Sequence, residues 1–133
     1  MSDNLVDLMR AGLARFEQTG EIQSGFISPD FELHQSSSIV DTAGVFRGEN
    51  AFRESLAELS ESFEDMVFKA EDVLEAPGGE IVVLIHTHGR GRGSGIEIDN
   101  HIAWVWTFRG GRAVRMTIFE DPEEALAAVG LSR

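Results

Sequence analysis

The fold is decided by residues 81–108, which read IVVLIHTHGRGRGSGIEIDNHIAWVWTF. Residues 81–90 are largely apolar and β-branched, which is typical of a strand covered on both faces. The glycine-rich residues 91–95 predict a hairpin connection, and residues 96–108 predict a second long strand. A Gly110-Gly111 turn then leads to a third strand over residues 113–120. This part of the chain therefore predicts an antiparallel sheet.

Helical periodicity dominates the chain before this sheet. Apolar residues recur every three or four positions from Leu5 to Phe16, which predicts a first helix that ends at Gly20. A short second helix is predicted through Ile22 and Phe26. The clearest helical stripe consists of Phe52, Leu56, Leu59 and Phe63.

The remaining segments complete the expected order of elements. We expect a short strand over residues 31–35, a loop over residues 36–44, a loosely alternating strand over residues 66–74 and a turn at residues 77–79. A last helix is predicted with Asp121 as its cap, Pro122 and Glu124 in its first turn, and Gly130 at its end. Early helices followed by antiparallel strands indicate an α+β domain over residues 1–133, with the helices on one sheet face.

Composition excludes several classes of function. The chain has 133 residues, no cysteine and a formal net charge of −12. Cysteine chemistry is therefore absent, and nucleic acid and anionic membranes are poor partners for so acidic a chain. No apolar run approaches the roughly 20 residues of a membrane helix. The N-terminal residues do not resemble a signal peptide, so we expect a cytoplasmic location.

The sheet is expected to present apolar residues on its outer face as well. Alternation places Val83, Ile85, Ala103 and Val105 there. Left in water they would form a sizeable apolar patch, and a homodimer through the outer sheet face is the simplest cover. The alternative is burial under the N-terminal or the C-terminal helix.

Three stretches together carry a resemblance to a known family. They are residues 45–48 (VFRG), residues 91–95 (GRGSG), and residues 101–108 (HIAWVWTF) with the later residues 121–126 (DPEEAL). In this order they resemble the SnoaL-like branch of the nuclear-transport-factor-2-like superfamily, which also holds ketosteroid isomerase and polyketide cyclases. The resemblance covers nearly the whole chain. It implies a cone-shaped, curved antiparallel sheet wrapped around N-terminal helices, usually dimeric, with a pocket on the concave side.

The resemblance implies less about activity, because one fold hosts many functions. Ketosteroid isomerases pair a carboxylate base with an oxyanion hole of tyrosine and protonated aspartate. By the resemblance, that tyrosine falls on Phe16 and that aspartate on Trp104. The chain contains no tyrosine, so it cannot isomerise ketosteroids by this mechanism.

The histidines His86 and His88 are the sharpest chemical feature. Two apart on a strand, they project to the same face. A hairpin centred near Ser94 would pair His88 with Asn100 and His86 with Ile102. The predicted pocket wall then comprises Phe16, Asn100, Ile102, Trp104, Trp106, Met116 and Ile118, with Glu120 as its carboxylate. Such a wall suits a small apolar or cyclic metabolite with a few polar handles.

Two functions follow from this arrangement. The first is an enzyme of the isomerase, cyclase, dehydratase or hydrolase type, in which His86 or His88 acts as general acid or base and Glu120 as its partner. The second is a non-catalytic binding module that uses the histidines as hydrogen-bonding groups. An interaction protein that binds another chain through its sheet is a third alternative. We expect no cofactor.

Other polar motifs carry less weight. A His-x-His pair suggests a metal site with Glu120 or His34 as third ligand. However, glycines and arginines follow His88 where a cupin has an acid, so we expect no metal. His101 is expected on the face opposite His86, and Glu32 and His34 either line the pocket mouth or are simply solvated. A strand follows residues 91–95, which argues against a phosphate loop.

Overall fold

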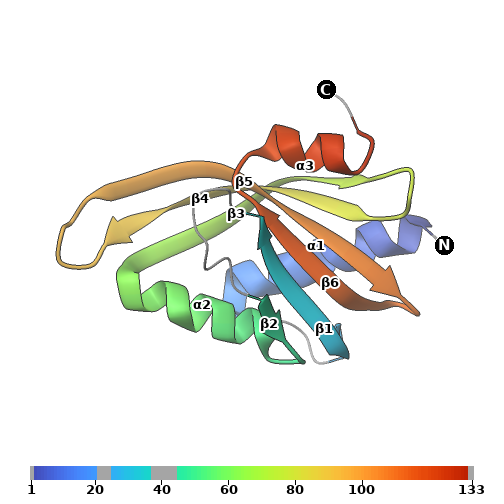
Figure 1. Cartoon of the computed structure of the whole chain (residues 1–133), viewed down its shortest axis with the longest axis horizontal. Helices are drawn as coiled ribbons and strands as arrows, with labels where there is room; N and C mark the ends of the chain where they lie inside the picture. The colour runs from blue at the N-terminus through green and yellow to red at the C-terminus, as the bar shows by residue number, and fades with distance from the viewer. Residues whose placement is uncertain (1, 21–24, 37–44, 132–133) are drawn as a thin grey trace.

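The computed structural model describes residues 2–20, 25–36 and 45–131. It contains six strands in one curved sheet, with helices on both sides (Figure 1). In chain order the elements are α1 (Ser2–Thr19), β1 (Ile27–Ser36), β2 (Val45–Arg47), α2 (Ala51–Ser62), β3 (Phe63–Glu75), β4 (Ile81–Gly91), β5 (Glu97–Arg109), β6 (Arg112–Phe119) and α3 (Pro122–Ala128). The α+β class and the curved sheet of the sequence analysis are thus confirmed, whereas the expectation that the helices lie on one sheet face is wrong for α3.

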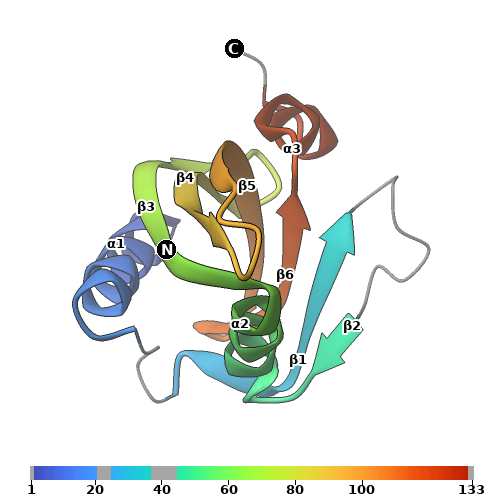
Figure 2. The same cartoon turned by 90° about the vertical axis from the view of Figure 1, so that its left-hand side faces the viewer.

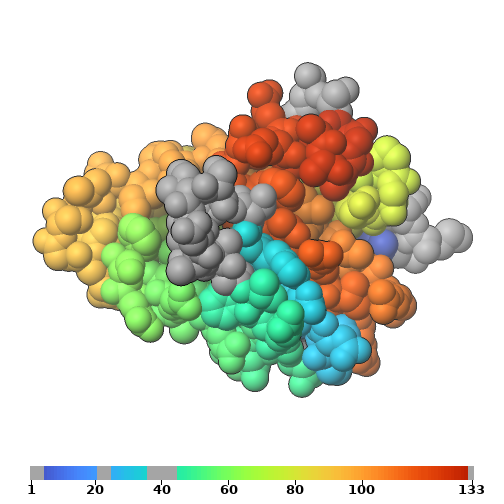
Figure 3. Space-filling view, in the orientation of Figure 1, coloured from blue at the N-terminus to red at the C-terminus, as the bar shows by residue number. Residues whose placement is uncertain are grey.

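The sheet has the strand order β2-β1-β6-β5-β4-β3. Neighbouring strands are antiparallel except β1 and β6, which run parallel. The curvature brings α1 and α2 to one side, and α3 lies on the other (Figure 2). In the space-filling view α3 lies beside the turn between β3 and β4 (Figure 3).

The main core lies between the concave side of the sheet and the first two helices. Trp106, Ile81 and Met116 are almost completely buried there. Met9 of α1 and Phe52 of α2 pack against the same cluster. Full burial of each such side chain contributes about 1.5–3 kcal/mol.

A second apolar cluster lies on the convex side. It consists of Val82, Leu84, Ala103 and Val105 of the sheet with Ala125 and Leu126 of α3. Because both faces of β4 are covered here, its sequence is an unbroken apolar run. The homodimer was predicted to cover Ala103 and Val105, but α3 covers them, which was the stated alternative. A homodimer stays a prediction.

Helix α3 begins as its sequence predicts. The Asp121 side chain accepts a hydrogen bond from the Glu123 backbone N–H at 2.9 Å, and Pro122 occupies the first helical turn. A cap of this kind stabilises a helix by about 1 kcal/mol. The cap fixes the start of α3, whose Ala125 and Leu126 pack on the convex cluster.

The register between β4 and β5 differs from the prediction by one residue. His86 lies opposite His101, and Ile85 lies opposite Ile102. The cause is the hairpin loop, because the Gly91 N–H donates to the Ile96 carbonyl at 2.9 Å and closes a loop of residues 92–95. Gly93 and Gly95 adopt positive φ angles of 83° and 70°, which glycine tolerates best.

This shift exchanges the two faces of β4. Val83 and Ile85, which were predicted on the outer face, pack in the main core with the tryptophans. His86 and His88 were predicted beside the tryptophans. They lie instead on the convex face, on the continuation of the side that holds Val82 and Leu84.

Three features of the element order also differ from the prediction. Phe26 lies in a bend directly before β1, not in a second helix, and Ile22 falls outside the described residues. Phe26 is held there by edge-to-face packing on Trp106 and Phe108, at centroid distances of 5.6 Å each. The strand predicted over residues 31–35 is longer, and of the predicted loop only Ser36, which ends β1, is described. Phe63 begins β3 instead of ending α2.

No helix among the described residues is long and apolar enough to cross a membrane.

Candidate functional site

A cavity of about 450 Å³ lies between α2 and the concave side of the sheet. Its wall comprises Gln35, Phe46, Phe52, Ser55, Leu56, Glu58, Leu59, Ser62, Phe63, Met66, Phe68, Thr87, Ile98, Asn100, Ile102, Trp104, Ile118 and Glu120. Helix α2 and strands β3 to β6 supply most of these residues, and β1 and β2 supply one each. The cavity is thus enclosed by the elements that the curvature of the sheet brings together.

Among the described residues, Trp104 is the wall residue with the most aromatic contacts. Its ring meets Phe52 edge-on at a centroid distance of 5.4 Å, and Phe68 packs on it at 5.8 Å. Phe16 of α1 supports it from behind at 6.3 Å. Aromatic pairs in such arrangements contribute about 0.5–1.5 kcal/mol beyond their buried area. The wall is therefore held in a fixed geometry.

Helix α2 contributes the polar residues Ser55, Glu58 and Ser62 to the wall, and the sheet side contributes two further polar groups. Thr87 and Asn100 lie opposite each other on β4 and β5. Gln35 is near the end of β1, and Glu120 directly follows β6. Such groups on a mostly apolar surface are what orients a bound organic molecule.

Thr87 is an unusual member of this set. Only 5% of the residue is exposed, and its hydroxyl has no hydrogen-bond partner among the described residues. An unsatisfied buried hydroxyl destabilises a fold by about 1–3 kcal/mol. The hydroxyl oxygen itself is shielded, although Thr87 is part of the cavity wall.

The structure places the predicted site residues in three groups. Asn100, Ile102, Trp104, Ile118 and Glu120 lie in the cavity wall. Three others lie in the core: Phe16 and Trp106 border a void of about 20 Å³, and Met116 is completely buried. His86 and His88 form the third group and lie on the convex face of the sheet, opposite the cavity.

Sequence reasoning missed Thr87, Gln35 and the cavity face of α2. The apolar helical stripe that includes Phe52 and Leu56 is present in the sequence, but such a stripe is equally typical of a helix face packed on the core. Thr87 lies between the two histidines, so the correct register would have placed it in the wall.

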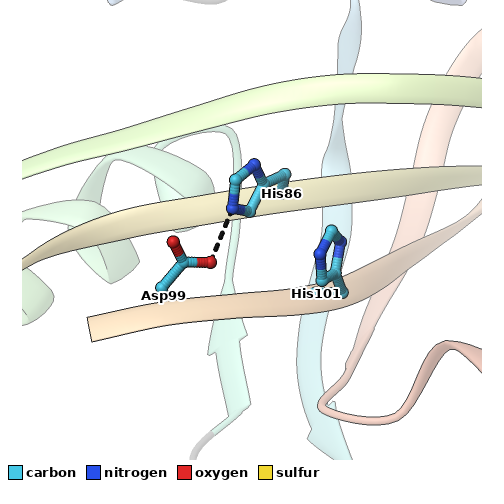
Figure 4. A group of neighbouring side chains, drawn as sticks. All are labelled: His86, Asp99 and His101. Carbon is cyan, nitrogen blue, oxygen red and sulfur yellow. Dashed lines mark hydrogen bonds and ion pairs between the residues drawn. The ribbon is translucent and has the colours of Figure 1, made fainter.

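The convex face carries a separate group of polar side chains. His86 Nε2 donates to Asp99 Oδ1 at 2.7 Å, and His101 Nδ1 donates to Glu71 Oε1 at 3.0 Å. The rings of His86 and His101 are stacked, with centroids 4.6 Å apart and planes at 13° (Figure 4). His101 was expected on the other face from His86; the register places the two side by side.

This arrangement separates the predicted acid–base partners. Glu120 lies in the cavity wall on the concave side, whereas His86 and His88 lie on the convex side. The carboxylate beside His86 is Asp99, and its hydrogen bond with His86 lowers the pKa of Asp99. The charge of any protonated histidine nearby acts in the same direction.

Glu32 and His34 form another pair on β1. His34 Nε2 lies 2.8 Å from Glu32 Oε1, and Arg47 Nε donates to Glu32 Oε2 at 3.3 Å. The hydrogen bond with His34 is the largest cause that lowers the pKa of Glu32, and Arg47 adds to it. Neither Glu32 nor His34 is part of the cavity wall.

The arginines of the hairpin are engaged by carboxylates. Arg90 pairs with Asp65, and Arg92 Nη1 lies 3.5 Å from Glu64 Oε1. Strand β5 follows the loop, as predicted, so the loop lacks the helix N-terminus of a phosphate-binding site.

Comparison with known proteins gives a family match. The profile of the SnoaL-like domain matches residues 15–116. No curated protein is significantly similar to the chain.

Solved structures of the same fold cover nearly the whole chain. TerC, co-crystallised with polyporic acid, is 22% identical with a TM-score of 0.70, and the match covers 94% of this chain and 96% of that one. An NTF2-like protein from Burkholderia thailandensis E264 is 18% identical with a TM-score of 0.73, covering 96% and 98%. A protein of ketosteroid isomerase-like fold from Catenulispora acidiphila DSM 44928, in complex with trimethylamine, is 12% identical with a TM-score of 0.66, covering 95% and 94%. At these identities the likeness concerns the fold.

Proposed function

The chain belongs to the SnoaL-like domain family of the nuclear-transport-factor-2-like superfamily, and from this premise we propose that it binds a small, largely apolar, cyclic molecule. The ligand occupies the cavity between α2 and the concave side of the sheet. TerC and the Catenulispora protein, which share the fold, were crystallised with small molecules, and this supports a ligand-binding role.

The cavity itself is the observation that carries the proposal. Its volume of about 450 Å³ lies within the roughly 300–1,000 Å³ of small-molecule sites. Its wall is mainly aromatic and aliphatic, and it includes Trp104. A rigid aromatic wall favours a flat ring system, because ring faces stack without loss of side-chain freedom.

The ionisable groups of the wall indicate which ligand charge the cavity favours. Among the described residues, the ionisable side chains of the wall are Glu58 and Glu120, and the wall contains no lysine, arginine or histidine. An anionic ligand would meet carboxylates without a compensating cation, which is unfavourable at short range. We therefore infer a neutral or cationic ligand whose hydroxyl or amino groups donate to Glu120 and the Asn100 amide.

The binding test uses the neutral bicyclic alcohol β-naphthol and its carboxylate counterpart naphthoate. The chain has two tryptophans, so a proton–nitrogen correlation spectrum contains two indole N–H signals. Trp104→Phe and Trp106→Phe assign them. Naphthol is expected to move the Trp104 signal more than the Trp106 signal, and naphthoate is expected to move neither.

A matched pair of variants checks the location of the ligand. Ser55→Phe places a ring in the cavity and is expected to abolish the naphthol shift. Ala57→Phe places the same ring on the exposed side of α2 and is expected to leave the shift unchanged. Equal binding by both variants, or no Trp104 shift in the unmodified chain, would contradict the proposal.

A second candidate is proton transfer on the bound molecule, of the isomerase or cyclase type. The observation in its favour is that Glu120 directly follows β6 and is part of the cavity wall, together with Ile118 and Ile102. A carboxylate on an apolar wall is a suitable general base for a proton next to a carbonyl group. His86 and His88 are not candidates for this step, because they lie on the convex face.

The cyclic ketone tetralone tests this second candidate. Deuterium exchange at its acidic carbon is followed by NMR in heavy water with and without protein. If Glu120 is the base, Glu120→Gln loses the accelerated exchange and retains naphthol binding, because the glutamine amide oxygen and Asn100 still accept the naphthol hydrogen bond. Exchange no faster than in buffer would contradict this second candidate and leave binding as the proposed function.

A further inference from the structure

The convex face of the sheet is divided into two halves. Helix α3 covers the half that holds Val82, Leu84, Ala103 and Val105. The other half carries imidazole and carboxylate groups of β3, β4 and β5 and has no helix over it among the described residues. Side-chain exposure rises from 29% at His86 to 59% at His101 and 71% at Asp99.

Three of these side chains can present ligand atoms to one point. One nitrogen of His86, one carboxylate oxygen of Asp99 and one nitrogen of His101 all lie within 4.8 Å of one another. The register explains the grouping, because His86 lies opposite His101 and Asp99 is two residues before His101 on the same face. The one-residue difference in register that places His86 on the convex face also places it beside Asp99.

From this geometry we propose a divalent transition-metal site formed by His86, Asp99 and His101, with zinc as its simplest occupant. Two imidazoles and one carboxylate are ligands that zinc and its first-row neighbours accept. This departs from the expectation of no metal, which rested on the acid being too far from the His-x-His pair along the chain.

The side chains need only small movements to bind. Metal–ligand bonds of about 2.0–2.1 Å place tetrahedral ligand atoms about 3.3 Å apart. His86 Nε2 and Asp99 Oδ1 are already 2.7 Å apart, joined by one hydrogen bond. When a cation binds at Nε2, a neutral His86 ring would carry its proton on Nδ1 instead, and a protonated ring would release one proton to solvent. Because Asp99 and His101 are exposed, their rotations meet little resistance.

Glu71 provides the outer contact that metal-binding histidines usually have. It lies at a bulge in β3 and accepts the hydrogen bond from His101 Nδ1. A neutral imidazole with its proton on Nδ1 has its free electron pair on Nε2. Glu71 thus fixes the tautomer and orientation in which His101 can bind a cation through Nε2.

The surrounding charges favour a cation on balance. Asp99 and Glu71 contribute two negative charges, against Lys69, which lies opposite His86 on β3. Lys69 is exposed, so solvent and salt screen it. The net charge of −12 adds a weak attraction for cations over the whole surface. Three protein ligands leave the fourth position of the metal to water.

The test is titration of the intact chain with zinc by calorimetry and with cobalt by visible absorption. One ion per chain is expected, with the intense visible bands of tetrahedral cobalt. His86→Gln, Asp99→Asn and His101→Gln are each expected to weaken binding by about tenfold or more, and Glu71→Gln by about 10–100-fold.

His34→Gln is the matched control, because His34 and Glu32 form an imidazole–carboxylate pair that has no third ligand among the described residues. It is expected to bind zinc as the unmodified chain does, and so is His88→Gln. Thermal melting verifies that each variant is folded. Absence of stoichiometric binding, or equal loss on substitution of His34 or His88, would overturn the assignment. Neither result would bear on the cavity, whose naphthol test uses the other face of the sheet.

Discussion

Thr87 gives the sharpest test of the cavity wall, because its hydroxyl is buried without a partner among the described residues. Thr87→Val replaces this hydroxyl by a methyl group of similar shape. The unsatisfied group destabilises the native state by about 1–3 kcal/mol, so the unliganded variant should be more stable by about 1–2 kcal/mol. For a chain of this size, that corresponds to a rise in Tm of about 3–10 °C.

The assay is urea and thermal unfolding followed by circular dichroism. Thr117→Val is the control, since Thr117 is only half-buried, on β6, and its change should lie within about 0.5 kcal/mol. If the hydroxyl also serves the ligand, Thr87→Val should weaken naphthol binding by about 2–10-fold while it raises stability. A loss of 1 kcal/mol or more in the stability of Thr87→Val would refute the reasoning, because it would mean that the hydroxyl has a partner.

Three further predictions concern the rest of the molecule. Leu126→Ala removes the largest side chain by which α3 covers the convex cluster, and urea unfolding should register a loss of about 2–5 kcal/mol; a loss below 1 kcal/mol would mean that α3 is not held there. The Glu32 carboxyl, titrated by NMR, should have a lowered pKa, so its stabilising effect is present above the ordinary carboxyl pKa and is lost as the pH falls through the lowered value. His34→Leu should raise the pKa of Glu32, and no change would exclude the hydrogen bond as the cause. If the chain forms the predicted homodimer through the outer sheet face, sedimentation should give twice the chain mass, and Val67→Glu should shift it to monomer, since Val67 is 45% exposed on the uncovered half; a monomeric unmodified chain would contradict the dimer.

The elements could be predicted from the sequence where local chemistry specifies them. The Asp121-Pro122 cap of α3 and the alternation of residues 96–108 are examples, because capping and pleating depend on neighbours in the chain. Phe26 shows the limit, since its place in a bend is set by contacts with Trp106 and Phe108, which are distant in sequence.

The site could be predicted only in part, because it depends on strand register. Glycine-rich residues 91–95 permit a hairpin centred at Ser94 as well as the observed four-residue loop, and one residue decides which face a side chain occupies. Trp104, Asn100 and Glu120 kept their predicted side. His86 and His88 lie on the face opposite to the predicted one, so neither is near Glu120 as the predicted catalytic pair requires.

The most direct test of the proposed binding site is a crystal structure of the protein grown with naphthol. The account predicts flat electron density between α2 and the sheet, stacked near Trp104, with the hydroxyl directed toward Glu120 or Asn100. A cavity filled by the side chains of its own wall, or naphthol found only on the convex face, would contradict it.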